Sequence, residues 1–443
     1  MKELPKGSKK LLKAWAFYDW ANSVYSLVIA STIFPIFYAA LTIVKNDKGE
    51  VVQDSVQLLG FDFNNDSLIS YVTAMAFMVV AVISPFLSGI ADYVGNKKNF
   101  LKFFCYLGAL SCIGLYWFTI ENLWFGLTCY FLALVGFWAS LVFYNSYLPD
   151  IAFPEQQDKV SAKGFSMGYI GSVILLILCL MMVLNYKWFG FEDESMPTRL
   201  SFVLTGIWWM GFSQITYYYL PKGNKKEKLT RDVLLNGFKE IKMIWRSFEN
   251  NPRLKKYLRA FFVYSMAVQT VMLVATYFGI EEVNWTGQDA TTGLIVSILL
   301  IQLVAIAGAN ITSRLSAKMG NIQTLILVNV FWIGICIYAF FVETPFQFYI
   351  AAGLVGLVMG GIQTLSRSTY SKMLPEGTLD TTSYFSFYDV SEKIGIVIGM
   401  SLYGIVAQVF GSIRFSVLFL TLFFVIGVIL LLKVPRTGKL AKK

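Results

Sequence analysis

The sequence contains no histidine and carries little charge. Of its 443 residues, 14% are charged and 56% are hydrophobic, whereas a soluble globular protein is about a quarter charged. The absence of histidine excludes Ser-His and Cys-His nucleophile pairs and histidine-based metal sites. The composition therefore predicts a polytopic membrane protein that is not an enzyme and that binds no metal or other cofactor.

Neither the cysteines nor any nucleotide-binding motif indicates a metal site or an ATP-driven activity. The cysteines lie inside apolar runs without the spacing of metal ligands, so we expect buried small side chains at each of them. They are Cys105, Cys112, Cys129, Cys179 and Cys336. No G-x-x-x-x-G-K-[ST] loop is present, which argues against a nucleotide-driven pump.

Long apolar runs make up most of the sequence. A helix needs about twenty mostly apolar residues to cross a bilayer. Twelve such runs are predicted as spans, at 17–43, 68–91, 100–119, 123–145, 164–186, 200–220, 257–280, 291–313, 322–342, 346–366, 387–410 and 413–433. The first is too long for a signal peptide, so we interpret it as an uncleaved span.

The distribution of Lys and Arg predicts the orientation of these spans. With the N-terminus, the even-to-odd connections and the C-terminus in the cytoplasm, that side receives 31 of the 37 Lys and Arg residues. The opposite side receives Lys45, Lys48, Lys187, Arg199 and Arg414, and Lys393 starts a span. By the positive-inside rule both termini are cytoplasmic, and a plasma (inner) membrane is expected. The same distribution explains the net charge of +10 without nucleic acid.

A basic connection divides the chain. Residues 1–220 form an N-terminal six-helix half, 221–256 a basic cytoplasmic linker, and 257–443 a C-terminal six-helix half. In the linker, Val233, Phe238, Ile241 and Trp245 recur at helical spacing, which predicts an amphipathic helix on the anionic inner leaflet. A protein-binding segment is the alternative.

The two halves repeat one another at three equivalent points. DYVGN at 92–96 matches AKMGN at 317–321, LPD at 148–150 matches LPE at 374–376, and VSAK at 160–163 matches VSEK at 390–393. Parallel repeats joined by a central loop are typical of alternating-access carriers, whose substrate site lies near the midplane. The pattern predicts an all-α membrane protein of twelve helices in two pseudo-symmetric halves.

The loop SGIADYVGNKKNFL at 88–101 resembles the signature between spans two and three of the major facilitator superfamily. The resemblance implies a cytoplasmic latch made by Gly89, Asp92, Gly95, Lys97 and Lys98. The alternative is an ordinary positive loop. The departures are the shifted glycine and three replaced positions: Tyr93, Asn96 and, in the second copy, Ala317.

Further motifs resemble one branch of that superfamily. W-x-x-Y-D-W-A-N-S at 15–23, NSYLPD at 145–150, GGIQTLSRS at 360–368 and FSFYDVSEK at 385–393 are similar to the unknown major facilitator family and the autophagy-linked vacuolar amino-acid exporters. The resemblance covers essentially the whole chain. It implies a carrier with an amino-acid-like small-molecule substrate, and we expect a monomer in the lipid bilayer, with a coupling proton as a further candidate partner.

Polar side chains inside the spans are candidates for substrate contact. Spans one, four, seven and ten line the cavity of this fold, which implicates Asn22, Ser26, Asn145, Gln269 and Gln363. An interhelical hydrogen bond is the alternative role for each amide. Glycines four residues apart, at 164 and 168, 356 and 360, and 395 and 399, predict close helix approach.

Charged residues in the spans are candidates for coupling and gating. We expect Asp19 to pair with Arg367 or Lys393, and Asp389, Glu392 and Lys393 to cluster, with Asp389–Lys393 as an internal pair. Asp19 is expected to be reached by water from the cytoplasm, with Trp15 and Trp20 anchoring the interface. Either Asp19 or Glu392 is a candidate proton carrier, and static ion pairs are the alternative.

Together these features predict a secondary active transporter that moves a small organic solute, most simply amino acids. Efflux of amphipathic compounds and uptake of cell-wall fragments are the alternatives within transport. A transporter-like receptor or scaffold, signalling through the basic linker, is the alternative from a different class.

Overall fold

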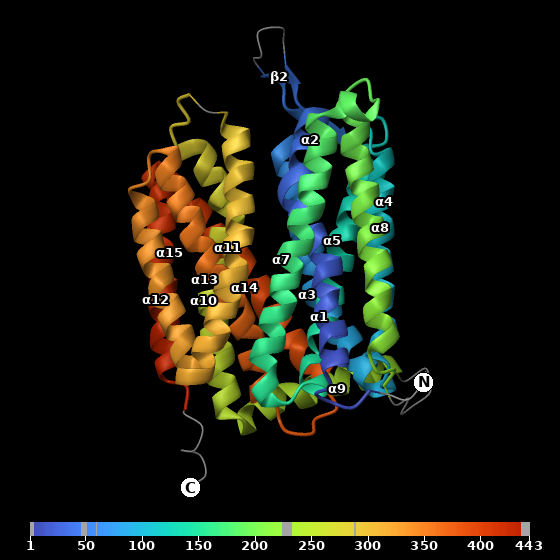
Figure 1. Ribbon diagram of the computed structural model, residues 1–443, viewed down its shortest axis with the longest axis vertical. Coiled ribbons are helices and arrows are strands. Elements are labelled where there is room, and N and C mark those ends of the chain that lie inside the picture. The colour runs from blue at the N-terminus through green and yellow to red at the C-terminus, as the bar shows by residue number, and fades with distance from the viewer. Residues whose placement is uncertain (1–3, 46–50, 59, 224–232, 288, 436–443) are drawn as a thin grey trace.

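The computed structural model describes residues 4–45, 51–58, 60–223, 233–287 and 289–435. The chain forms a bundle of long helices that run up and down one axis (Figure 1). Among the described residues, eleven helices are long and apolar enough to cross a membrane. A twelfth, α8 (Ser195–Tyr219), is less apolar because Trp, Tyr, Ser and Thr make up much of its sequence.

Twelve spans follow in chain order. The first is α1 (Lys9–Val24), the π-helical segment η1 (Tyr25–Ile33) and α2 (Phe34–Thr42) in one continuous run. The next five are α3 (Asn65–Val94), α4 (Lys97–Gly114), α5 (Leu123–Asn145), α7 (Pro154–Leu184) and α8. The last six are α10 (Pro252–Glu282), α11 (Ala290–Met319), α12 (Asn321–Phe340), α13 (Pro345–Met373), α14 (Thr381–Phe410) and α15 (Ile413–Leu432). Short helices η2 (Leu115–Trp117), α6 (Leu148–Ile151) and η3 (Tyr186–Phe189) lie between spans.

The hydrophobic core is divided between two groups of helices. One cluster of buried side chains, around Trp15 and Trp209, is built from α1 to α8. The other, around Trp332 and Tyr370, is built almost entirely from α9 to α15. The groups meet where α3 packs on α14 and where α7 packs on α11 and α13. The predicted fold class, twelve helices in two six-helix halves, is confirmed.

The two ends of the bundle differ. Helix α1 begins and α15 ends at one end, which we call the base (Figure 1). At the other end, strands β1 (Val44–Lys45) and β2 (Val51–Gln53) pair antiparallel, as do β3 (Ser55–Leu58) and β4 (Phe61–Asn64). Two small antiparallel strand pairs therefore lie at the end opposite the base.

Several spans extend beyond their predicted apolar runs at the base. Helix α7 begins at Pro154 rather than 164, α13 ends at Met373 rather than 366, and α14 begins at Thr381 rather than 387. Hydropathy marks only the apolar part of a helix, whereas polar turns continue wherever their backbone groups stay hydrogen-bonded. These extra turns carry many of the polar contacts between the halves.

The linker contains α9 (Val233–Asn250), which crosses the base (Figure 1). It packs on α3 and also contacts α10 and α14. Ile244 and Phe248 are buried, and Phe248 contacts the rings of Tyr384 and Phe387. Helix α9 thus binds the bundle through an Ile244–Phe248 stripe, while Trp245 is exposed, and its place on the inner leaflet stays a prediction.

Part of the linker prediction remains outside the structural description. Residues 224–232 lie outside the described residues, as do the side chains of Val233, Phe238 and Ile241. Lys239 and Lys242 of α9 are described and exposed. The basic face of α9 is therefore accessible at these two positions.

Candidate functional site

A buried ion pair joins the two halves near the base. The Arg367 guanidinium, on α13, donates from Nη1 and Nη2 to Asp19 Oδ2 on α1, at 3.3 and 3.2 Å. The two side chains are 3% and 5% exposed. The structure therefore pairs Asp19 with Arg367 rather than with Lys393.

All the described hydrogen bonds of the Arg367 side chain go to the first half. Besides Asp19, the guanidinium donates to Asn145 Oδ1 at 3.2 Å, Ser161 Oγ at 3.0 Å and Ser161 O at 3.0 Å. Such charge-assisted hydrogen bonds are stronger than neutral ones. Arg367 thus fits into a polar socket that α1, α5 and α7 build.

Aromatic rings complete this socket. The guanidinium carbon lies 4.0 Å from the centroid of the Phe165 ring and 4.9 Å from that of Trp15, distances at which the cation is attracted to the ring. Tyr144, stacked on Trp15, donates from its hydroxyl to Asp19 Oδ2 at 2.9 Å. Asp19 therefore accepts from two residues.

Gly164 creates the space for the pair. A methyl group at this position would overlap Asp19 Oδ2 and lie 3.1 Å from Arg367 Nη2. One turn later, a methyl group at Gly168 would overlap Ser23 Oγ. The glycine spacing of α7 thus serves its close contact with α1, the helix that carries Asp19.

The expected surroundings of Asp19 need correction. The residue is 4% exposed and Trp15 is fully buried, so neither lies at a wet membrane surface. Trp20 packs in the bundle too, with its ring stacked 5.5 Å from that of Trp208 on α8. Helix α1 is covered by α7 and α8, and its polar motif therefore meets protein rather than lipid headgroups.

The predicted substrate-contact residues do not form one cluster. Asn145 belongs to the Arg367 socket. Gln363 accepts from the Tyr169 hydroxyl across the halves at 2.6 Å, and Gln269 donates to Glu392 Oε1 at 2.5 Å. Asn22 is buried with its Nδ2 atom unpaired, and Ser26, in the π-helical segment η1, is exposed. The amides of Asn145, Gln269 and Gln363 are thus held by interhelical hydrogen bonds.

The three predicted charges of α14 lie together. Lys393 Nζ donates to Asp389 Oδ1 at 2.8 Å and to Glu392 Oε2 at 3.3 Å. The same Nζ atom lies 3.6 Å from the centroid of the Trp138 ring on α5, in the other half. Lys393 is therefore shared by two carboxylates and by the facing half.

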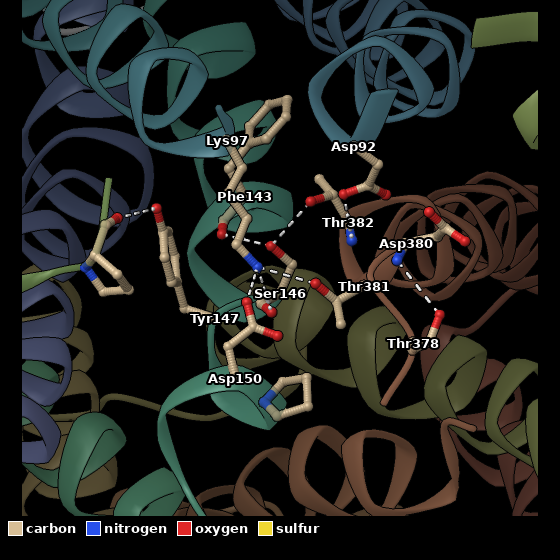
Figure 2. A network of polar contacts seen from close by, with 12 residues as sticks. Asp92, Lys97, Phe143, Ser146, Tyr147, Asp150, Thr378, Asp380, Thr381 and Thr382 are labelled. Atoms are coloured by element: carbon tan, nitrogen blue, oxygen red, sulfur yellow. Dashed lines mark hydrogen bonds and ion pairs between the residues drawn. The ribbon is translucent and has the colours of Figure 1, made fainter. Parts of the chain in front are cut away.

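A first latch at the base joins α3 to α14, and Figure 2 shows Asp92 and Thr382, one residue from each helix. Asp92 accepts hydrogen bonds from the backbone N–H groups of Thr382 and Ser383, at 3.3 and 2.7 Å. These groups belong to the first turn of α14, where free N–H groups and the helix dipole favour an anion. We call this contact the Asp92 latch.

Lys97 and Lys98, the basic residues of the 88–101 loop, contact groups other than Asp92. Lys97 forms an ion pair with Asp150 and donates to Ser146 O at 3.0 Å and Thr381 Oγ1 at 2.9 Å (Figure 2). Lys98 donates to Leu220 O at 2.7 Å. Gly95 makes the turn with φ +67°, which glycine adopts readily, and Gly89 lies buried in α3.

A second latch, absent from the sequence prediction, joins α7 to the other half. Asp158 accepts from Ser316 Oγ at 2.9 Å, Asn321 Nδ2 at 2.8 Å and Lys372 Nζ at 2.6 Å. Ser316 and Asn321 flank the turn that repeats the Asp92 loop, and Ala317 stands there in place of the acid. The acid missing from this copy is thus supplied across the interface, in what we call the Asp158 latch.

Sequence signals were weak for Asp158, Lys372 and Ser161, which were not among the predicted site residues. Asp158 lies just before the VSAK repeat but outside the predicted apolar run, and Lys372 lies beyond the predicted end of span ten. Ser161 is an ordinary residue by type, and its contact with Arg367 is visible only in three dimensions. Among the described residues, no three His, Cys, Asp or Glu side chains are grouped to bind a metal ion.

Comparison with known proteins identifies the family of the chain. The family model described as "Vacuole effluxer Atg22 like" matches residues 7–441. An uncharacterized major facilitator-type transporter of Bacillus subtilis, YxiO, is 30% identical over 431 residues, covering 96% of this chain and 94% of that protein. Autophagy-related protein 22 of Kluyveromyces lactis is 24% identical over 477 residues, covering 96% and 93%.

Solved structures show the same fold. The Escherichia coli fucose:proton symporter FucP aligns with a TM-score of 0.66 at 15% identity, over 97% of this chain and 98% of that one. The proton:xylose symporter XylE aligns with a TM-score of 0.68 at 12% identity, over 97% and 96%. The chain is therefore an integral multi-pass membrane transporter rather than an enzyme, and it belongs to the Atg22-like family of the major facilitator superfamily.

Proposed function

We propose that the protein is a secondary active carrier that moves amino acids by alternating access of its two halves. The names of the matching family and relatives support a role in transport. The main support for alternating access is the buried Asp19–Arg367 pair, which joins the two halves. Amino acids are zwitterions, which suit a passage that offers amides, hydroxyls and charges of both signs. Because ionic and polar contacts join the two halves at the base, we assign the structure to the state that is closed there.

The ion pair makes opening of the base a distinct energetic step. Arg367 belongs to the second half and its described hydrogen-bond partners to the first, so separating the halves at the base breaks every one of them. Leaving a buried charge without its partner costs about 3–5 kcal/mol. The pair thus stabilises the base-closed state, and the bound substrate has to favour the open state by a comparable amount.

The residues proposed to contact substrate lie above this pair, toward the middle of the bundle. They are Asn22, Ser26, Gln269 and Gln363. The unpaired Nδ2 atom of Asn22 offers a donor, and the π-helical backbone around Ser26 is a kind of irregularity that often marks functional sites. Their amide and hydroxyl groups provide donors and acceptors for carboxylate and ammonium groups.

The function is tested by counterflow in proteoliposomes. Purified protein is reconstituted with an unlabelled amino-acid mixture inside, and entry of each radiolabelled amino acid is followed. We expect counterflow with wild type and with Glu281→Gln, an exposed change on α10, and at least tenfold slower exchange with Asp19→Asn or Arg367→Gln. If every amino acid fails while amphipathic drugs or cell-wall fragments exchange, the proposed substrate class is wrong. Binding without exchange by any solute would instead indicate a receptor.

We also propose that the base faces the cytoplasm of a cell whose plasma membrane holds the protein. The Lys and Arg distribution supports this orientation. The native cysteines are all buried, so an added cysteine reports its own side. We expect a membrane-impermeant maleimide to label Glu192→Cys, at the end opposite the base, in intact cells and to leave Lys239→Cys on α9 unlabelled. The reverse pattern contradicts the orientation.

A further inference from the structure

The charges around Lys393 do not balance. Asp389 and Glu392 both contact the single Nζ atom of Lys393, so two carboxylates share one ammonium group. The Lys393 side chain is 1% exposed, that of Asp389 8% and that of Glu392 16%. An excess negative charge inside a membrane-spanning bundle is costly. A further cation is therefore needed to neutralise the cluster.

One carboxylate oxygen of the cluster has no hydrogen-bond partner. Asp389 Oδ2 is buried and accepts no hydrogen bond from the described residues, while Oδ1 is bound to Lys393. Buried polar atoms are almost always paired, so an unpaired buried oxygen calls for a physical explanation, such as a functional role or a bound ion. The orphan atom thus lies on the residue that shares Lys393 with Glu392.

Among the described residues, Lys393 is the only Lys or Arg that forms an ion pair with Asp389 or Glu392. The exposed basic side chains of α9 (Lys239, Lys242 and Arg246) form no ion pair with the cluster, nor do the basic side chains in the first turns of α10 (Arg253, Lys255, Lys256 and Arg259). On α13, Arg367 is bound to Asp19; on α15, Arg414 is bound to Glu282; and on α3, Asp92 is bound to the start of α14. Helix α5 contributes the Trp138 ring, and α9 contacts α14 through Trp245, Ser247 and Phe248. Helix α10 contributes Gln269, which donates to Glu392 Oε1 at 2.5 Å, and the buried phenol of Tyr264, while Tyr388 on α14 itself is also buried. None of these groups supplies the missing positive charge.

We propose that Asp389 and Glu392 share one bound proton, and that their cluster with Lys393 and Gln269 is the carrier's proton-binding site. Addition of one proton converts one carboxylate to a neutral carboxyl group and leaves the other paired with Lys393. The cluster is then neutral. The coupling of this proton to transport rests on the function proposed above, whereas its binding does not.

The Asp19–Arg367 pair and the α14 cluster are thereby assigned different tasks. At Asp19, one carboxylate faces one guanidinium and accepts from Arg367 and Tyr144, so its charge is already balanced. Protonation there would remove the partner of a buried arginine. At Glu392, protonation removes an excess charge, and the side chain is the more exposed of the two carboxylates. The α14 cluster is therefore the site that gains from a proton.

Thermal unfolding of the purified full-length protein tests the binding of the proton. The melting temperature is measured from about pH 5 to about pH 8 in potassium buffers. A proton held more tightly by the folded cluster than by the unfolded chain stabilises the protein at low pH, and this stability is lost as the pH rises. We expect the melting temperature of wild type to fall by several degrees across the range, and that of the matched control Glu281→Gln to fall equally.

The pH dependence of the melting temperature of Glu392→Gln and Asp389→Asn decides whether this cluster binds the proton. Either change leaves one carboxylate against Lys393, so the cluster is neutral without a proton. We expect both variants to lose most of the pH-dependent fall and to melt above wild type at about pH 8. If Asp389→Asn does not fold, Glu392→Gln, at the more exposed position, suffices.

Two outcomes overturn the proposal. The first is a pH-dependent fall that both variants retain. The second is a rise in the melting temperature of wild type, but of neither variant, when sodium replaces potassium at about pH 8, which would make the cation Na⁺. Counterflow is measured in parallel to separate the two proposals. If the protein shows the pH effect but exchanges no amino acid, the proposed function is wrong while the proposed proton site stands.

Discussion

The two latches at the base hold the same pair of halves by different means. Asp92 binds backbone N–H groups at the start of α14, whereas Asp158 binds the side chains of Ser316, Asn321 and Lys372. Both acids belong to the first half. The repeat in the sequence is therefore not a repeat of the interaction, because the second copy of the loop carries Ala317 and receives its acid from the opposite half.

The partners decide how each latch responds to substitution. Thr382 and Ser383 are fully buried, so their N–H groups cannot form hydrogen bonds with water in place of those lost when Asp92 is removed. The partners of Asp158 have substitutes: Asn321 also donates to Thr369 Oγ1, and Ser316 also donates to Ser313 O. Lys372, 23% exposed, can reach solvent. The Asp92 latch is thus the less replaceable one.

The largest effect is expected from Asp92→Ala. Loss of the carboxylate leaves buried backbone donors unsatisfied and should destabilise the base-closed state by about 3 kcal/mol. Spin labels at Glu155→Cys and Glu376→Cys, exposed at the base of the first and second half, report this state. We expect a longer distance between the labels in the variant. An unchanged distance distribution would show that the latch is not needed for closure.

A smaller effect is expected from Asp158→Ala, about 1 kcal/mol with the same labels. Its coupling to Lys372 is measured by a cycle with Lys372→Met and the double variant. Because Lys372 loses its only ion-pair partner among the described residues, we expect the double variant to be less destabilised than the sum of the single ones. Strict additivity would contradict a direct pairing, and an effect larger than that of Asp92→Ala would reverse the ranking.

The smallest effect is expected from restoring the acid to the repeat. Asp158→Asn combined with Ala317→Asp returns the carboxylate to the position equivalent to Asp92. The facing helix α7 begins with Pro154, which has no N–H group, and continues with Glu155, which repels an anion. We therefore expect no recovery of the base-closed population relative to Asp158→Asn alone. Recovery would mean that the two interfaces are equivalent after all.

Much of the fold was predictable because the bilayer restricts it. Apolar runs of about twenty residues must form helices in lipid, which located all twelve spans. The ends were less predictable, since the polar turns of α7 and α14 at the base are invisible to hydropathy. The linker helix was predicted as well, but not that Ile244 and Phe248 bind it to the bundle.

The order of the residues was enough to identify which polar side chains enter the membrane and to predict the fold of twelve helices in two halves. A charge such as Asp19, Arg367 or Asp389 in an apolar run is too costly to lack a partner, so its presence alone marks it. The partners of these charges became visible only in three dimensions: Arg367 rather than Lys393 for Asp19, α14 for Asp92, and Lys372 for Asp158. The reason is that these partners lie on separate helices far apart in the chain, where helical spacing carries no information about distance.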